Sequence, residues 1–176
     1  MAMRVLAIDP GYDRLGIAVL EGDVSQPTLV WSACITPAKG TRANRLAEVK
    51  GAIEDAIQKY KPDLVALETL FFGVNKKTAL GVAGARGVAL AAAGTAGLQV
   101  LERSPQQVKI AVTGEGRADK AAVARMIPRL IALPPRPAGQ KRLDDELDAI
   151  ALGIAALAQK NIFAQIESPR HITPRG

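Results

Sequence analysis

The sequence RVLAIDPG, residues 4–11, decides the fold. Val5 to Ile8 are apolar without alternation, which is typical of a central strand covered on both faces of a sheet. Asp9 follows at once, and Pro10 and Gly11 force a turn behind it. The end of such a strand is where α/β proteins build their binding sites, so Asp9 is the first candidate for function.

Four more short apolar runs indicate strands, and five stretches with helical character lie among them. The strands are expected at residues 16–20, 29–35, 64–67 and 98–101, and the helices at 41–60, 75–96, 104–112, 118–130 and 143–159. Short connections between the first three strands are compatible with an antiparallel meander. The order of the elements predicts an α/β fold, with a mixed five-stranded sheet flanked by helices.

The composition is that of one folded domain. The chain has 176 residues, of which 48% are hydrophobic and 23% charged, and this is enough to bury a core without disulfides. Disordered chains and disulfide scaffolds are therefore excluded. Residues 160–176 contain Pro169, Pro174 and scattered charges without an apolar stripe, and we expect a mobile C-terminal tail there.

The charge and the rare residues narrow the function. A net charge of +6 and a sequence pI near 9.7 indicate a polyanionic partner. Cys34 and His171 are the only cysteine and the only histidine of the sequence. Their scarcity argues against a zinc site and against a catalytic triad built on histidine.

The sequence shows neither a signal peptide nor a membrane-spanning segment. Met1 to Asp9 lack the apolar stretch of a signal peptide, and Arg86 interrupts the Ala/Gly-rich segment 79–97. We therefore expect a cytoplasmic protein without a membrane span.

Acidic residues occur at three places that the fold could bring together. They are Asp9 after the first strand, Glu68 after the fourth, and Asp144, Asp145 and Asp148 in the first turns of the last helix. Spacing does not choose between Asp144 and Asp145 as the partner of Asp148, because both lie near it on the helix surface. First-turn acids also stabilise a helix through its dipole without any further function.

The apolar pattern of the last helix favours the alternative in which its acids only stabilise the helix. The apolar stripe of the last helix is Leu143, Leu147, Ile150, Ile154 and Leu157, and the acids point away from it. Four carboxylates in one cleft would nevertheless raise one another's pKa, and divalent cations such as Mg²⁺ would relieve the repulsion. Two such ions can activate a water and stabilise the leaving oxygen of a phosphodiester. Together with the basic charge, these acids predict a nuclease.

Five motifs occur in the order and spacing of a known family. They are IDPG at 8–11, ALE at 66–68, GARG at 84–87, the segment 114–120 and DELDA at 145–149. Over residues 3–158 the chain resembles the RuvC-type Holliday-junction resolvases. The resemblance implies a ribonuclease-H-like nuclease domain at 1–159, a homodimer, and Mg²⁺-dependent paired nicking of four-way junction DNA.

The resemblance also implies the metal site and the partners. The metal-binding carboxylates of the family match Asp9, Glu68, Asp145 and Asp148, which favours Asp145 over Asp144. These residues would hold two Mg²⁺ ions, for which Mn²⁺ can substitute. The RuvA–RuvB branch-migration complex is the implied partner, and the Ala/Gly-rich helix is our candidate for the dimer interface.

Basic and aromatic residues complete the expected site. Lys109 and Lys120 match family lysines near the cleft, where they would hold the scissile phosphate, and Phe71 matches an aromatic residue that stacks on an unpaired base. The candidate phosphate contacts, which position DNA without reading its sequence, are Lys76, Lys77, Arg86, Arg117, Lys141 and Arg142. Each basic residue has an alternative as an ordinary surface residue, and Phe71 has one as a core residue.

Some observations keep other functions open. The chain departs from the family at Tyr12, where a small polar residue is common, and at Glu115 in the glycine loop. A YqgF-like nuclease of the same fold would act on RNA or on ordinary duplexes. An actin-like ATPase would need a second phosphate loop, for which 176 residues leave no second lobe. A non-catalytic basic module would show no activity that EDTA could remove.

Overall fold

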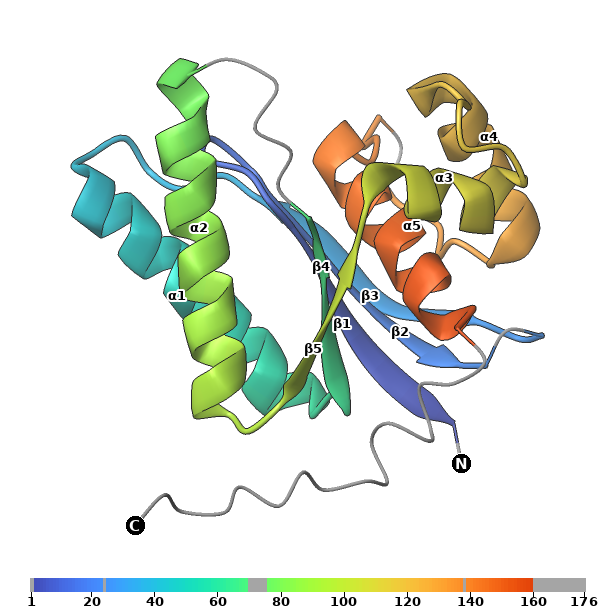
Figure 1. Cartoon of the computed structure of the whole chain (residues 1–176), viewed down its shortest axis with the longest axis horizontal. Coiled ribbons are helices and arrows are strands. Elements are labelled where there is room, and N and C mark those ends of the chain that lie inside the picture. Colours follow the sequence, from blue (N-terminus) through green and yellow to red (C-terminus); the bar gives the residue numbers. More distant parts are fainter. Residues whose placement is uncertain (1, 24, 70–75, 138, 160–176) are drawn as a thin grey trace, which may run out of the picture.

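The computed structural model describes residues 2–23, 25–69, 76–137 and 139–159, with the backbone alone for 76–78. The expected tail at 160–176 lies outside them. The strands are β1 Met3–Pro10, β2 Leu15–Gly22, β3 Thr28–Ile35, β4 Leu64–Glu68 and β5 Gln99–Arg103. They form one sheet in the order β3-β2-β1-β4-β5 (Figure 1). β1, β2 and β3 pair antiparallel, while β4 runs parallel to β1 and to β5, so the predicted mixed sheet is confirmed.

Helices cover both faces of this sheet (Figure 1). They are α1 Arg42–Tyr60, α2 Lys76–Thr95, α3 Pro105–Thr113, α4 Lys120–Leu130 and α5 Asp144–Leu157. Val5 and Ala7 of β1 join the core beneath α3, α4 and α5, whereas Leu6 and Ile8 join the core beneath α1 and α2. A strand buried on both faces needs apolar residues at every position, which explains the unbroken run in β1.

The last helix is enclosed by the rest of the protein. α5 contacts all five strands as well as α3 and α4, and every residue from Ala149 to Leu157 is buried. The expectation of a single apolar stripe is therefore wrong, because a helix between a sheet and two other helices has no solvent face over this length. Gly153 allows the close approach, since a Cβ there would lie 2.3 Å from Leu20 Cδ1.

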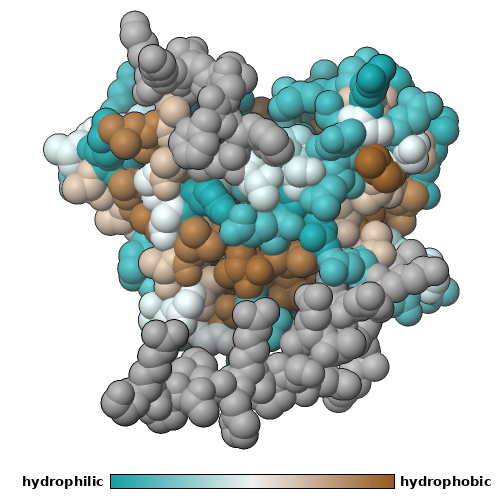
Figure 2. All heavy atoms as spheres, in the orientation of Figure 1, coloured by the Kyte–Doolittle hydropathy of each residue, from teal (hydrophilic) through white to brown (hydrophobic). Residues whose placement is uncertain are grey.

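The Ala/Gly-rich segment forms α2. Ala85, Ala89, Ala92 and Ala93 are buried, and their small side chains let the helix lie close to α1 and β1. Within the ranges described, no helix is long and apolar enough to cross a membrane. Figure 2 shows hydrophilic residues gathered between the two helical layers, next to an apolar band.

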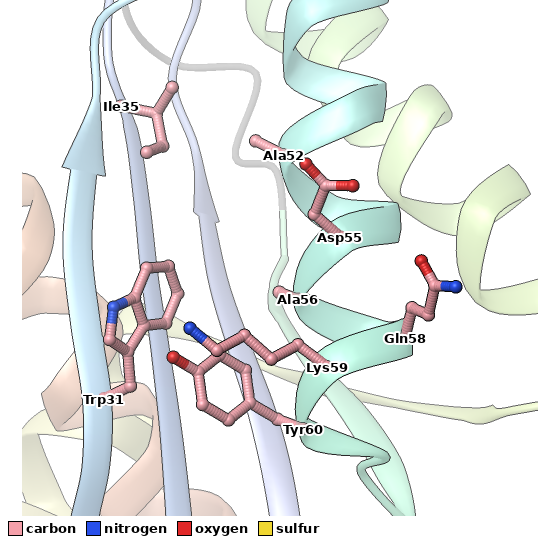
Figure 3. A pocket seen from close by; sticks show the side chains of 8 residues that line it. All are labelled: Trp31, Ile35, Ala52, Asp55, Ala56, Gln58, Lys59 and Tyr60. Atoms are coloured by element: carbon pink, nitrogen blue, oxygen red, sulfur yellow. The ribbon is translucent and has the colours of Figure 1, made fainter.

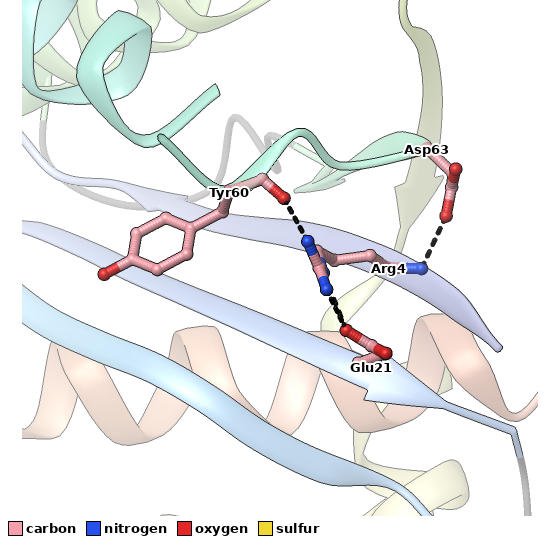
Figure 4. A network of polar contacts seen from close by, with 4 residues as sticks. All are labelled: Arg4, Glu21, Tyr60 and Asp63. Carbon is pink, nitrogen blue, oxygen red and sulfur yellow. Dashed lines mark hydrogen bonds and ion pairs between the residues drawn. The ribbon is translucent and has the colours of Figure 1, made fainter. Parts of the chain in front are cut away.

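Polar and aromatic contacts stabilise the parts of the sheet away from Asp9. At the amino-terminal end of β1, Arg4 donates to Glu21 at 2.7 Å and to the carbonyl oxygen of Tyr60 at 2.6 Å, and its backbone N–H donates to Asp63 at 2.7 Å (Figure 4). The Tyr60 ring stacks on Trp31 with centroids 5.3 Å apart, in a hollow between β3 and α1 (Figure 3). These residues have structural roles at the far end of the molecule from the acids.

Candidate active site

The first two acids meet because β1 and β4 are parallel neighbours. Ile8 pairs with Leu67 in their register, so Asp9 and Glu68, the next residue of each strand, lie side by side at the same edge of the sheet. Both residues are partly buried. The sequence indicates that each acid lies at the end of a strand, because each directly follows a short apolar run, and the pairing of β1 with β4 brings the two acids together.

The acids of α5 reach the same edge beside Gly16. In the antiparallel pair of β1 and β2, Gly16 is the partner of Asp9. A Cβ at Gly16 would lie 1.9 Å from the carbonyl oxygen of Asp145, so the start of α5 can lie here only because position 16 has no side chain. Asp148 follows about one helical turn later. The fold therefore gathers Asp9, Glu68, Asp145 and Asp148 into one site.

The pKa of Asp9 reflects how close these acids are. Burial is the main cause that raises it from its ordinary value of 3.8 to about 7, followed by the charges of Asp148, Glu68 and Asp145, with Lys120 opposing. Burial and the charge of Asp148 also raise the pKa of Glu68. Carboxylates that repel one another in this way favour a bound cation.

Two cationic side chains contact the acids of α5. Lys120, the first residue of α4, donates to Asp148 Oδ2 at 2.8 Å, and this hydrogen bond raises the pKa of the lysine. Arg14, in the turn between β1 and β2, places Nε 2.9 Å from Asp145 Oδ2. Arg14 is absent from the residues predicted from sequence because no motif marks it, and only the packing of α5 on β2 brings it to Asp145.

The donor set fits a divalent cation in its chemistry. Carboxylate oxygens are the ligands that Mg²⁺ prefers. Asp145 Oδ2 is buried and accepts no hydrogen bond, so the N–H of Arg14 is close to it without being aligned. An oxygen that accepts no hydrogen bond keeps lone pairs that a divalent cation can coordinate.

The side chains as they lie do not yet enclose an ion. Within the described part of the chain, no three carboxylate, histidine or cysteine side chains are arranged to hold one metal. In this arrangement Asp145 contacts Arg14 and Asp148 contacts Lys120.

Comparison with known proteins decides the family. The profile of the family "Crossover junction endodeoxyribonuclease RuvC" matches residues 5–156. The chain belongs to the RuvC family. The RuvC protein of Thermobifida fusca is 43% identical over 159 residues, covering 88% of this chain and 84% of that one. The RuvC protein of Streptomyces coelicolor is 42% identical over 156 residues, covering 86% of this chain and 80% of that one.

Solved structures agree with the RuvC assignment. The structure "T. thermophilus RuvC in complex with Holliday junction substrate" matches with a TM-score of 0.78 at 28% identity, covering 94% of this chain and 96% of that one. The yeast mitochondrial Holliday junction resolvase Ydc2 matches with a TM-score of 0.68 at 12% identity, covering 94% and 80%, and supports the fold alone. The predicted ribonuclease-H-like fold is confirmed, and as a RuvC protein the chain is a nuclease.

The structure separates Asp145 from its neighbour in this RuvC chain. Asp145 is among the charges that raise the pKa of Asp9. Asp144 is exposed, and its charge acts on Lys120 instead. The geometry therefore supports Asp145 as the partner of Asp148, which sequence spacing leaves open.

The basic residues predicted to contact DNA differ in how exposed they are and in whether they form an ion pair within the protein. Arg117 is exposed just before α4, and the charge of Lys109 on α3 acts to lower the pKa of Glu68. Arg86 forms an ion pair of 2.6 Å with Glu102 and is only 14% exposed, so it ties α2 to β5. Phe71 lies outside the described residues, and the structure describes only the backbone of Lys76 and Lys77.

Next to the acids of the site, a buried glutamate forms hydrogen bonds and ion pairs that the sequence does not indicate. Glu146 is 1% exposed. Ser32 Oγ donates to Glu146 Oε1 at 2.6 Å, Arg136 donates to the same oxygen, and Arg142 Nε lies 3.6 Å from it. The network fastens the Pro-rich segment before α5 to this helix, and it gives Arg142, a candidate phosphate contact, an internal partner. In the run Asp144 to Glu146, no pattern marks the glutamate as the one that is buried.

Proposed function

We propose that this chain resolves Holliday junctions by paired, symmetric nicking of phosphodiester bonds in DNA recombination and repair. The convergence of Asp9, Glu68, Asp145 and Asp148 at one edge of the sheet carries the proposal. The similar T. thermophilus RuvC was solved in complex with Holliday junction substrate. The family match favours DNA over the RNA-directed alternative of the same fold.

The four carboxylates would hold the metal, which we propose to be Mg²⁺, two ions per site, with Mn²⁺ as a substitute. When bound, the metal supplies an activated water and stabilises the leaving oxygen. Asp9 and Glu68 are fixed by paired strands, and Asp145 and Asp148 by the start of an enclosed helix. The contribution of the protein is thus to hold the ligand oxygens in place and to make their repulsion favour a cation.

Lys120 and Lys109 would hold the scissile phosphate. The Lys120 side chain is 74% exposed although it contacts Asp148, and an exposed ion pair of this kind stabilises the protein by less than about 1 kcal/mol. Lys120 can therefore turn toward a phosphate at little cost. A hollow of about 250 Å³ between α4 and α5, lined in part by Lys120 and Asp148, provides room there.

Other basic residues would position the DNA backbone, and an aromatic residue would stack on an unpaired base. Arg117 is the exposed candidate before α4. The remaining candidates in the chain are Phe71 for stacking, and Lys76, Lys77, Arg86, Lys141 and Arg142 for phosphates. Arg86 would have to leave Glu102 in order to contact a phosphate, so we expect it to contribute less than Arg117.

We propose a homodimer through α2, because two symmetric cuts require two active sites related by a twofold axis. A Cβ at Gly87 or Gly94 would meet no other atom within 4 Å, although glycine weakens a helix by about 1 kcal/mol relative to alanine. Leu80 and Leu90 of the same helix are 61% and 37% exposed. A second copy would cover these residues.

We propose that the protein works in the cytoplasm and that the RuvA–RuvB branch-migration complex is its partner.

Cleavage of a labelled four-way junction tests the proposal. Wild type, Asp145→Asn and the matched control Asp144→Asn are compared with Mg²⁺ and with EDTA. We expect wild type and Asp144→Asn to cut at symmetric positions in Mg²⁺ alone, and Asp145→Asn to bind the junction without cutting it. Faster cutting of structured RNA or linear duplex would contradict the substrate, and full activity of Asp145→Asn would contradict the metal site.

A further inference from the structure

Arg14 faces a carboxylate oxygen that the proposed metal would use. It lies five residues after Asp9, in the turn between β1 and β2. Its Nε is 2.9 Å from Asp145 Oδ2, which is buried and accepts no hydrogen bond. The contact is therefore electrostatic and leaves the oxygen able to take another partner.

The backbone of this turn is held while the side chain of Arg14 can move. Arg45 donates to the carbonyl oxygen of Tyr12 at 2.9 Å and to Asp13 at 3.0 Å, and its guanidinium lies 4.4 Å from the centre of the Tyr12 ring. The ring packs against Gly81 of α2. Because the Arg14 side chain is 46% exposed, it can swing into solvent without disturbing these contacts.

A divalent cation and the Arg14 guanidinium would both bind the carboxylate of Asp145. The Arg14 side chain, 46% exposed, can give way by moving into solvent. Two positive groups about 4 Å apart in a partly buried site repel each other strongly. The binding of one to Asp145 therefore weakens the binding of the other.

We propose that Arg14 is an internal counter-ion of Asp145 that competes with the metal and sets the metal concentration at which the site fills. It is a positioning residue that acts through Asp145, and the inference rests on the proposed metal site. Before the metal arrives, Arg14 offsets part of the negative charge that Asp145 adds to the site of Asp9. With a metal bound, Arg14 would no longer be needed to offset this charge, and its side chain would turn toward solvent.

Titration with Mn²⁺, followed by the electron paramagnetic resonance signal of the free ion, tests the competition without any cleavage assay. The chains are wild type, Arg14→Gln, Arg14→Lys and, as a control for net charge, Arg129→Gln. Arg129 is exposed in the last turn of α4, about 13 Å along the helix from Lys120. We expect the first Mn²⁺ to bind Arg14→Gln roughly three- to tenfold more tightly than wild type, as for the loss of a partly exposed ion pair.

The variants that keep the charge near Asp145 are expected to behave differently. Arg14→Lys and Arg129→Gln should bind Mn²⁺ within about twofold of wild type. Urea unfolding gives a second readout: Arg14→Gln should be less stable than wild type in EDTA and at least as stable in saturating Mg²⁺. Arg14→Lys keeps the test decisive if the glutamine variant does not fold, because tighter binding by the lysine variant would overturn the counter-ion role.

The outcomes separate this inference from the metal site itself. If wild type binds Mn²⁺ and Arg14→Gln binds it no more tightly, the counter-ion role is wrong and the metal site stands. If Arg129→Gln tightens binding as much as Arg14→Gln, the effect is one of net charge and the inference is again wrong. If wild type binds no Mn²⁺, the proposed metal site and the role of Arg14 are both wrong.

Discussion

Replacing Asp9 by asparagine should stabilise the protein, and more so at high pH. Burial and neighbouring charges raise the pKa of Asp9 from 3.8 to about 7 in the folded protein. Below pH 3.8 the carboxyl is protonated in both states, so it causes no pH dependence. Above 3.8 the unfolded chain releases the proton, while the folded protein keeps it until pH 7. The wild type therefore loses stability as the pH rises from about 4 to 7 and loses no more above 7.

The size of the effect follows from the same shift. Each pH unit between the two pKa values costs about 1.36 kcal/mol, so Asp9 lowers the free energy of unfolding by roughly 1.6 kcal/mol at pH 5 and roughly 4 kcal/mol at pH 8. Asparagine has nearly the same shape and does not ionise. The gain on replacement should therefore be larger at pH 8 than at pH 5 by roughly 3 kcal/mol.

Urea unfolding in EDTA at the two pH values measures this difference. Asp55→Asn, at an exposed position of α1, is the matched control and should show no such difference between the two pH values. Saturating Mg²⁺ should remove much of the advantage of Asp9→Asn at pH 8, because the wild type alone keeps this ligand. An equal gain at pH 5 and pH 8, or a loss at pH 8, would show that Asp9 is not in the crowded acidic site described above.

Three other perturbations test the packing and the metal site. Glu146→Ala should lower the free energy of unfolding in urea by about 3 kcal/mol, because it removes the buried carboxylate that pairs with the partly exposed Arg136 and Arg142, and a change below about 1 kcal/mol would contradict the network. Gly81→Ala should cost about 1–3 kcal/mol, because the new Cβ would lie 2.3 Å from Tyr12 Cδ2, and Tyr12→Ala in the same chain should recover most of it. Mg²⁺ at a hundred times its Kd should stabilise wild type by about 2.7 kcal/mol in calorimetry, and an equal effect on Asp148→Asn would argue against that ligand.

The strand-borne half of the site could be predicted from sequence because its signals are local. The unbroken apolar run of β1 indicates burial on both faces, and the run before Glu68 indicates the same for β4. An acid directly after each run must then lie at the edge of the sheet. What sequence does not supply is that β1 and β4 are neighbours, on which the meeting of Asp9 and Glu68 depends.

The helix-borne half could not be predicted in the same way. The last helix was expected to bury one stripe, yet it is enclosed from Ala149 onward. A run of apolar and small residues was the available signal, but a stripe can be drawn through such a run as easily as an all-round core. The contact of Arg14 with Asp145 and the burial of Glu146 follow from that enclosure, and neither has a motif of its own.

The enclosure of α5 also explains how four acids can be tolerated in one place. The core around its second half fixes the helix, and its first turn carries Asp144, Asp145 and Glu146. The amino-terminal end of a helix carries a partial positive charge that favours anions there. Arg14, Lys120 and the pair around Glu146 each neutralise a different acid of α5. Asp9 has no ion pair of this kind among the described residues, and it is the acid whose pKa is raised to about 7. A bound cation would therefore relieve the repulsion that raises the pKa of Asp9.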